Sequence, residues 1–308
     1  MASSDKSLSN SILEKIVKDW PKLDLQSQEK LSHSLTQSIA RMIYGSNMIE
    51  FAGSSLDITI SMCQDVFLSK SADPAGIHDY NPNRFSFSQL VEHLKANNRP
   101  TNLAEVEKSI REVVQHIQAL VHVLIHIVIN DRAWTEKLLS ETHQILYKGL
   151  DKEVEAGKYR TFEIAIRYGK TENQPKVKPC LRASAVRGYM KEFIAHLKKD
   201  TKTEMDPFER AACCHHQFIN IYPFGNGNGR MSRILVTVLL LKHAGAVCEI
   251  GLTQEERDKY VAICIRGARK FYEEDMEVDY DERMGHLRLA RFIKEKSKSW
   301  KDWKMKEE

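Results

Sequence analysis

The chain has 308 residues, of which 42% are hydrophobic and 29% are charged, and this is the composition of a folded globular protein rather than a disordered or fibrous one. The formal net charge is only +4, and no basic stripe runs through the central sequence, so we expect no nucleic-acid binding. The basic stretch 291–308, which contains Trp300 and Trp303, is expected to be a solvated helix end, with a docking site for an acidic partner as the alternative.

Cysteine usage and apolar runs indicate the compartment. The six cysteines include no pair at CxxC spacing, and several lie in apolar segments such as AVCEI, where a free thiol behaves as a small hydrophobic side chain. This usage favours a reducing compartment. The N-terminal segment lacks the apolar core of a secretory signal, and the longest apolar run, IQALVHVLIHIVI, is short for a bilayer span. We expect a cytoplasmic protein without membrane contact; nuclear residence and a secreted effector stay open.

Helical periodicity dominates the chain. Residues 9–68 predict two or more helices with breaks near WPKLD and YGSN, and residues 69–86, rich in Pro, Gly, Asn and Asp, predict a long loop at a domain boundary. Further helices are expected over 102–129, 132–150, 183–199, 206–221, 229–244 and 253–271. We predict a mainly α protein with an N-terminal helical region (1–100), a core domain (101–290) and a basic C-terminal tail (291–308).

One segment departs from this helical pattern. Residues 157–179 alternate through Phe162, Ile164 and Ile166, and a turn-rich stretch with two prolines follows, which predicts a short β-hairpin. A lone hairpin is marginally stable in water. On a helical scaffold we therefore expect a flap that pairs with an extended segment by strand addition; a decorative loop is the alternative.

The most informative stretch is FINIYPFGNGNGRMSRIL, residues 218–235. The residues on both sides of its glycines show helical periodicity, so the glycine loop joins two helices. The dinucleotide-binding fingerprint and the phosphate loop of nucleotide hydrolases both need a strand before the glycines. Neither assignment fits this sequence.

The loop nevertheless has the features of an anion site. Gly225, Gly227 and Gly229 can adopt positive φ, so that successive N–H groups point into one concavity. The following helix adds unpaired N–H groups and the positive end of its dipole. Arg230 and Arg233 lie three residues apart, hence on one face, and each presents a planar fork of donors. We predict that the loop binds a polyphosphate; a glycine-rich turn with incidental arginines is the alternative.

The stretch IYPFGNGNGRMSR resembles the signature of the Fic family, usually HPFx(D/E)GNGRxxR. The anchors of that signature are present at Pro223, Phe224, Gly227, Asn228, Gly229, Arg230 and Arg233. Weaker resemblances to the family extend over residues 40–275. The resemblance implies a mainly α, Fic-type helical bundle with a short β-hairpin flap. It also implies a protein adenylyltransferase, which transfers AMP from Mg-ATP to a Ser, Thr or Tyr hydroxyl of a protein target.

The resemblance assigns roles to particular residues. The phosphates would be cradled by the loop, at Gly225, Gly227, Asn228 and Gly229. Arg230 would act in catalysis by gripping the β-phosphate, and Arg233 would hold the γ-phosphate. Tyr260, in DKYVAI, would line the adenine pocket. GKYRTFEIAI resembles the strand that enters the Fic flap, which would hold the target's backbone through Thr161, Phe162, Ile164 and Ile166.

Two positions depart from the Fic signature. Tyr222 stands where the family has the histidine that acts as general base, and Asn226 stands where it has the acidic residue that binds Mg²⁺. A phenol has a pKa near 10, and neighbouring phosphates raise it further, so loss of an oriented base costs about 10²–10⁴-fold in rate. An amide oxygen still binds Mg²⁺, but without negative charge.

Several functions therefore stay open at this point. The chain is expected to be a weakened adenylyltransferase or a non-catalytic nucleotide-binding scaffold. Because the loop recognises phosphates and not the group attached to them, transfer of UMP, phosphate or phosphocholine from another donor is a third reading. Whether Tyr222 is natural or engineered, and whether the protein forms a homodimer, also stay open.

An upstream motif bears on regulation. YGSNMIEFAG resembles the inhibitory Fic motif (S/T)xxxE(G/N), with Ser46 and Glu50 in place and Phe51 instead of the usual small residue. Ser46 and Glu50 are four residues apart and share a helix face. The resemblance implies that Glu50 pairs with Arg233 and keeps the γ-phosphate from it; an ordinary exposed glutamate is the alternative.

Overall fold

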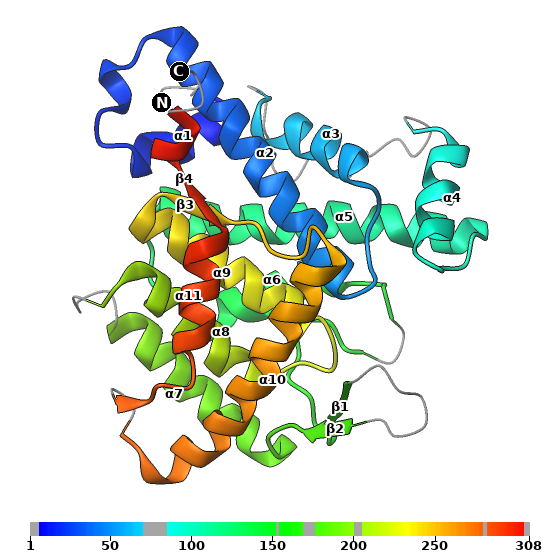
Figure 1. The fold of residues 1–308 in the computed structure, drawn as a ribbon, viewed down its shortest axis with the longest axis vertical. Helices are drawn as coiled ribbons and strands as arrows, with labels where there is room; N and C mark the ends of the chain where they lie inside the picture. The colour runs from blue at the N-terminus through cyan, green and yellow to red at the C-terminus, as the bar shows by residue number, and fades with distance from the viewer. Residues whose placement is uncertain are drawn as a thin grey trace.

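The computed structural model describes residues 6–69, 85–151, 154–168, 176–199, 205–279 and 282–304. Helices account for most of these residues and confirm the expected mainly α fold (Figure 1). The first half contains α1 (Leu8–Ile16), η1 (Trp20–Lys22), α2 (Leu25–Ile49), α3 (Leu56–Phe67), α4 (Phe87–Ala96), α5 (Leu103–Leu124), the π-helical turn η4 (Ile125–Ile129) and α6 (Glu136–Tyr147). The second half contains η5 (Ala183–Ala185), α7 (Val186–Lys199), α8 (Pro207–Ile221), α9 (Asn228–Ala244), α10 (Gln254–Glu277), α11 (Leu287–Lys296) and α12 (Trp300–Lys304).

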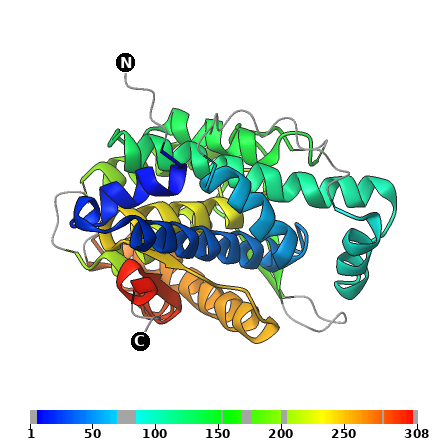
Figure 2. The same cartoon turned by 90° about the horizontal axis from the view of Figure 1, so that it is seen from above.

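The centre of the fold is α9, the helix that follows the glycine loop. Every residue from Asn228 to Leu241 is buried, because this segment is apolar on nearly all sides and a helix of that kind must be covered all round. It packs against α8, α5, α1 and α2. Figure 2 shows α9 (yellow) between α2 (blue) and α5 (green). The glycine loop is therefore attached to a helix whose first fourteen residues are all buried.

The helix α2 differs from the sequence-based expectation. We expected a break at YGSN, but α2 continues through Gly45 and ends at Ile49. A Cβ added to Gly45 would lie 2.1 Å from the carbonyl oxygen of Ile250. Glycine is needed here because another backbone approaches the helix closely, and not because the helix stops. The uninterrupted helix carries Ser46 and the neighbouring Glu50 to the glycine loop.

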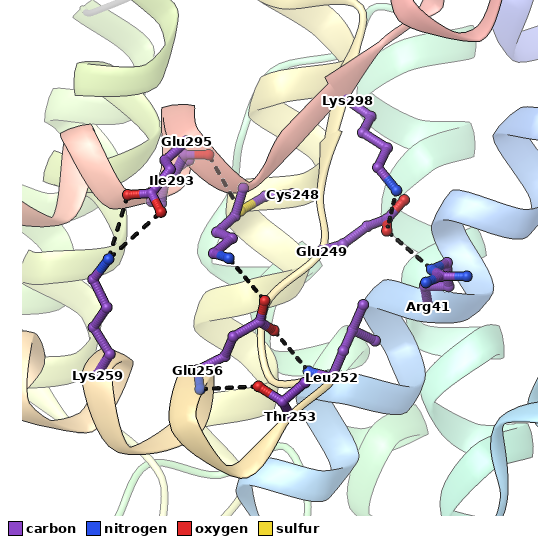
Figure 3. A network of polar contacts seen from close by, with 11 residues as sticks. Arg41, Cys248, Glu249, Leu252, Thr253, Glu256, Lys259, Ile293, Glu295 and Lys298 are labelled. Atoms are coloured by element: carbon purple, nitrogen blue, oxygen red, sulfur yellow. Dashed lines mark hydrogen bonds and ion pairs between the residues drawn. The ribbon is translucent and has the colours of Figure 1, made fainter. Parts of the chain in front are cut away.

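The C-terminal residues also differ from the expectation. Instead of forming a solvated end, β4 (Ser297–Ser299) pairs antiparallel with β3 (Ala246–Cys248), and Trp303 is buried. A polar network surrounds this pairing (Figure 3). At its centre Glu249, only 4% exposed, accepts hydrogen bonds from Ser38 Oγ (2.8 Å), Arg41 Nε (3.1 Å) and Lys298 Nζ (2.9 Å). Because Ser38 and Arg41 belong to α2, the network ties β4 to the helix that precedes Glu50.

The expected hairpin is present and projects from the helical body (Figure 1). Its strands are β1 (Ala165–Tyr168) and β2 (Lys176–Pro179), which pair antiparallel with Ile166 opposite Lys178. The strands are shorter than expected, since residues 157–164 have no regular strand structure. The turn at 169–175, and all but the ends of the loop expected over 69–86, lie outside the described residues.

One helix is long and apolar enough to cross a membrane by length and composition. It is α5 with η4, Leu103–Ile129, and 67% of its most apolar window is buried inside the fold. Its side chains pack against α6 and α9. The burial is that of a core helix.

Gly45 provides a test of the α2 geometry. We predict that Gly45→Ala destabilises the protein by about 1–3 kcal/mol or more, because the new methyl group meets backbone that cannot rotate away. Gly188, in α7, is the matched control, since an added Cβ there meets nothing within 4 Å. Gly188→Ala should stabilise by about 0.5–1 kcal/mol. Urea denaturation of both variants measures the difference, and equal effects would contradict the close approach.

Candidate nucleotide-binding site

The glycine loop is a tight turn between α8 and α9. Tyr222 ends α8 with a left-handed backbone (φ 52°), and Gly227 precedes α9 with φ 76°. Asn228 closes the loop with its side chain, whose Oδ1 accepts the Phe224 N–H (3.0 Å) and whose Nδ2 donates to the Phe224 carbonyl (2.8 Å). The Asn228 amide is thus used within the loop, so what this residue offers a phosphate is its backbone N–H at the start of α9.

His143 supports the loop from α6. Its Nδ1 accepts the Gly157 N–H (2.8 Å), so Nε2 carries the proton and donates to the Asn226 carbonyl (2.9 Å). Its ring stacks on Phe224 with centroids 3.7 Å apart. Burial lowers the pKa of His143 to about 4, which keeps the ring neutral and in this tautomer. Sequence reasoning missed this residue, because nothing in a single helical histidine indicates which loop it reaches.

Arg160 joins the base of the flap to the loop and was also missed. Its backbone N–H donates to the Pro223 carbonyl (2.9 Å) and its Nε to the Tyr222 carbonyl (2.8 Å). Its other donors reach the carbonyls of Phe162 (3.0 Å) and Leu181 on the two sides of the hairpin. The side chain is 4% exposed, and a buried guanidinium hydrogen-bonded to these three carbonyls fixes the flap relative to the loop.

Arg233 is held by the end of α2. Its Nε donates to Ser46 Oγ (2.7 Å) and its Nη2 to the Ser46 carbonyl (3.0 Å). The same Nη2 pairs with Glu50 Oε1 at 2.6 Å, so the expected contact between Glu50 and Arg233 is present. The Nη1 donates to Tyr260 Oη (3.2 Å), which in turn contacts His215 Nε2 (2.6 Å).

Glu50 also occupies the start of α9. A Cβ added to Gly229 would lie 2.0 Å from Glu50 Oε1, so the carboxylate sits directly against the first turn of the helix. An anion is favoured at this position by the unpaired N–H groups and the positive end of the helix dipole. The protein therefore places one of its own anions where a phosphate is expected to bind.

Arg230 is buried but has donors to spare. Its side chain is 4% exposed, and within the described part of the chain its Nε and Nη1 have no hydrogen-bond partner. The guanidinium lies 5.4 Å from the centre of the Tyr147 ring. Buried donors are normally satisfied, so these two N–H groups favour an anion that is not part of the chain.

A cavity of about 270 Å³ adjoins the loop, close to the lower end of the range for small-molecule sites. It is lined by Ile49, Glu50, Ile166, Lys178, Ile219, Tyr222, Gly229, Arg233, Tyr260, Val261, Cys264 and Ile265. The cavity thus brings together Tyr222 at the predicted base position, the second signature arginine, the glutamate predicted to be inhibitory and two residues of the hairpin, Ile166 and Lys178. Burial raises the pKa of the Tyr222 phenol, and the negative charge of Glu50 adds to the increase. A neutral phenol with so high a pKa is a poor proton acceptor.

The remaining predicted residues lie around the cavity without lining it. Thr161 and Phe162 are exposed and Ile164 is half-buried, although a Cβ on Gly225 would lie 3.3 Å from Phe162 Cζ, so the ring covers the loop. Asn226 is exposed, and its Oδ1 accepts the Gly227 N–H at 2.7 Å. In the described ranges, no group of three His, Cys, Asp or Glu side chains is arranged to hold a metal ion.

Part of the chain matches a known protein family. Residues 133–240 match the model of the Fic/DOC family, and this range runs from just before α6 to near the end of α9, across the whole glycine loop. These residues are therefore similar to a Fic/DOC-family domain. His143, Arg160 and both signature arginines fall within the matched range.

Curated relatives match a stretch of this chain, and a solved structure shares its fold. Residues of this chain are 32% identical to the protein adenylyltransferase fic-1 of Caenorhabditis briggsae over 90 residues, which is 29% of this chain and 16% of that protein. They are 37% identical to the protein adenylyltransferase Fic of Drosophila ananassae over 71 residues, 23% of this chain and 14% of that protein. The matches therefore span less than a fifth of these relatives. A Fic-domain-containing signalling protein from Bacteroides thetaiotaomicron shares the fold, with a TM-score of 0.60 over 93% of this chain and 92% of that one at 17% identity.

The support given by His143 is testable through pH. Its pKa is about 4 in the fold and about 6.5 in an unfolded chain. A depressed pKa means that the stability contribution is complete above about pH 6.5 and is lost as the pH falls towards 4. His143→Phe keeps an aromatic ring but removes the titratable group. We predict that the unfolding free energy of this variant rises less steeply with pH in this window, by up to about 1.4 kcal/mol per pH unit. Urea titrations between pH 4.5 and 7 measure it, and an unchanged slope would contradict the neutral, buried ring.

Proposed function

We propose that the protein binds ATP with Mg²⁺ at the glycine loop and transfers AMP to a hydroxyl group of a protein target, slowed by Tyr222 and restrained by Glu50. The observation that carries the proposal is the Glu50 carboxylate, which contacts both Arg233 and the start of α9. A site that holds an internal anion in this way is suited to the negative phosphates of a nucleotide. The adenylyltransferase names of the relatives support AMP as the transferred group.

The polyphosphate would be held by groups that are already in place. The unpartnered donors of Arg230 and the first N–H groups of α9 suit the phosphates nearest the loop. Arg233 becomes available to the terminal phosphate only when Glu50 moves from it, because their 2.6 Å contact uses the same donor. Competition between a carboxylate and a phosphate for one guanidinium is the proposed basis of the restraint.

The transfer step would proceed by attack of the target hydroxyl oxygen on the α-phosphorus. The new bond joins this oxygen to the α-phosphorus, the bond between the α-phosphorus and the bridging oxygen breaks, and pyrophosphate leaves. The hydroxyl proton must go to an acceptor. Tyr222 is a poor one because burial raises its pKa, so the proton would pass to solvent or to a phosphate oxygen. The loss of an oriented base costs about 10²–10⁴-fold.

Asn226 is the residue that fits the position of a metal ligand. It offers one neutral oxygen, which already accepts the Gly227 N–H, and an amide oxygen is an accepted Mg²⁺ ligand. Mg²⁺ supplies charge neutralisation for the phosphates when bound. Because Asn226 adds no negative charge, we expect the nucleotide's own phosphate oxygens to provide most of the affinity for the ion.

The flap is the proposed docking element for the target. Strand β1 follows Phe162, which covers the loop and is 51% exposed, and an extended segment could add to the two-stranded hairpin through backbone hydrogen bonds. Arg160 ties this hairpin to the Tyr222 carbonyl, so a docked segment would lie at a fixed distance from the base position. The free thiols of Cys63, Cys180, Cys248 and Cys264 support our further proposal of a reducing, cytoplasmic location.

A second candidate function is a nucleotide-binding scaffold without catalysis. The burial of Tyr222 favours it, because a phenol with a raised pKa leaves the site without a proton acceptor at the expected position. Both candidates share the nucleotide site and differ in whether any AMP is transferred.

The restraint by Glu50 is tested by its removal. We predict that Glu50→Gly strengthens ATP binding by about 10-fold or more, since one charged hydrogen bond to Arg233 no longer competes. Glu50→Gln, which keeps the shape and removes the charge, should give a smaller increase. Glu107→Gln, at an exposed position of α5, is the control. Isothermal titration calorimetry measures all four proteins, and unchanged affinity in both Glu50 variants would refute the restraint.

The missing base is tested at Tyr222. We predict that Tyr222→His raises AMP transfer to a target or to the protein itself by about 10²-fold or more, because imidazole titrates near neutral pH. Tyr222→Phe should be neutral if the ring only fills the cavity. Incorporation of label from α-³²P-ATP measures the rate. If Tyr222→His and Tyr222→His/Asn226→Asp both bind ATP without any transfer, the scaffold function takes the place of the enzyme.

A further inference from the structure

A half-buried lysine that lines the cavity has no role in the function described so far. Lys178, on β2, lines the cavity together with Cys264 and Ile265 of α10. Among the residues that the structure describes, its ammonium group has no carboxylate partner and makes one hydrogen bond, to Asn220 Oδ1 at 2.6 Å. Burial lowers the pKa of Lys178. An ammonium group carries three N–H donors, so two of them remain for a ligand.

Asn220 holds this lysine in a defined orientation. Its side chain is fully buried, and its Nδ2 donates to the His216 carbonyl one turn earlier in α8 at 2.7 Å. The amide oxygen must therefore face Lys178. Since the Asn220 donor is committed to α8, the lysine is the polar group that this pair presents to the cavity.

The lysine lies beside the part of the cavity wall that follows Tyr260 along α10. Arg233 contacts Tyr260 near the start of α10. Cys264, one helical turn further on, also lines the cavity and is close enough to Lys178 to act on its pKa. One turn of α-helix rises by about 5.4 Å, so the cavity has Arg233 near Tyr260 and Lys178 near the next turn of the same helix.

The walls of the cavity suit a flat apolar ring. Val261, Cys264 and Ile265 follow one face of α10, and Ile166 and Ile219 line the cavity with them. Apolar side chains on the walls and one placed donor are the usual design of a site for an aromatic ligand. The hydroxyl groups of a sugar would find few partners there.

We propose that Lys178, oriented by Asn220, recognises the base of the bound nucleotide by donating a hydrogen bond to an acceptor on its ring, an inference that rests on the nucleotide-binding function proposed above. In adenine the acceptors are ring nitrogens, because the exocyclic amino group is a donor and is repelled by an ammonium group. Lys178 is therefore a specificity residue of the donor nucleotide, contributed by the flap.

The test compares a nucleotide with a ligand that has no base. Calorimetry of the full chain with ATP and with inorganic tripolyphosphate should show that Lys178→Met weakens ATP binding by about 10- to 100-fold and leaves tripolyphosphate binding unchanged. Lys158→Met, on an exposed lysine before the hairpin, is the matched control and should change neither. Equal weakening of both ligands would make Lys178 a phosphate contact, and unchanged ATP binding would remove it from the site; either result overturns the proposal.

A second measurement starts from the unaltered chain, so its first result does not depend on the folding of a variant. With the unaltered chain, one of 1-deaza-, 3-deaza- and 7-deaza-ATP, each lacking one ring acceptor, should bind about 10-fold or more weakly than ATP. For that analogue, Lys178→Met should cause no further loss, because the same hydrogen bond is already missing. If all three bind like ATP, or if every loss adds to that of Lys178→Met, the proposal is wrong.

Different results would disprove the proposed nucleotide site itself. Arg230→Met should weaken ATP and tripolyphosphate alike, since its unpartnered donors are assigned to phosphates. If neither ligand binds to the unaltered chain or to the Glu50→Gly variant, the proposed function falls. If both ligands bind and only the response to Lys178→Met is absent, the base contact alone falls.

Discussion

The contact on which the site depends is the one between Glu50 and Arg233. An arginine as buried as this one requires partners, because a lone charge in the protein interior carries a large desolvation penalty. Ser46 and Glu50 from α2 and Tyr260 from α10 supply them. The contact therefore joins three helices at the point where α9 begins. A phosphate could pair with the same guanidinium in place of Glu50. Either anion would balance the buried positive charge of Arg233.

The conformation of the loop is maintained by side chains that need not touch a ligand. His143, Arg160 and Asn228 all bind backbone groups of the loop or the flap. Each is buried, so its hydrogen bonds are shielded from competing water. The conformation of the loop is thus fixed by hydrogen bonds from side chains in the protein core. Asn226, whose side chain is exposed, and Tyr222, whose side chain is half-buried, take part mainly through local and backbone hydrogen bonds.

Local pattern was sufficient for most helices and for the glycine loop. Helix periodicity located α8 and α9, and the spacing of Arg230 and Arg233 indicated an anion site between them. A local pattern could not predict contacts between residues that are far apart in the sequence. The expected break near YGSN is wrong, because the sequence does not show that the carbonyl of Ile250 lies beside Gly45. The strands β3 and β4 have three residues each, which is too short for a periodicity of their own, and 48 residues separate Cys248 from Ser297. His143 and Arg160 were missed for the same reason, since their partners are backbone atoms far away in the chain.

The complete enclosure of α9 has a consequence for how this chain can change over evolutionary time. A helix with no free face tolerates few changes of side-chain volume, and the loop that precedes it is fixed by the same packing. Tyr222 is different, because its ring enters a cavity and not the packed core. A residue at such a position can be exchanged with less repacking than one inside α9. A lineage could therefore change the side chain at this position in a single step, retain the fold and the cavity, and reverse the change equally easily.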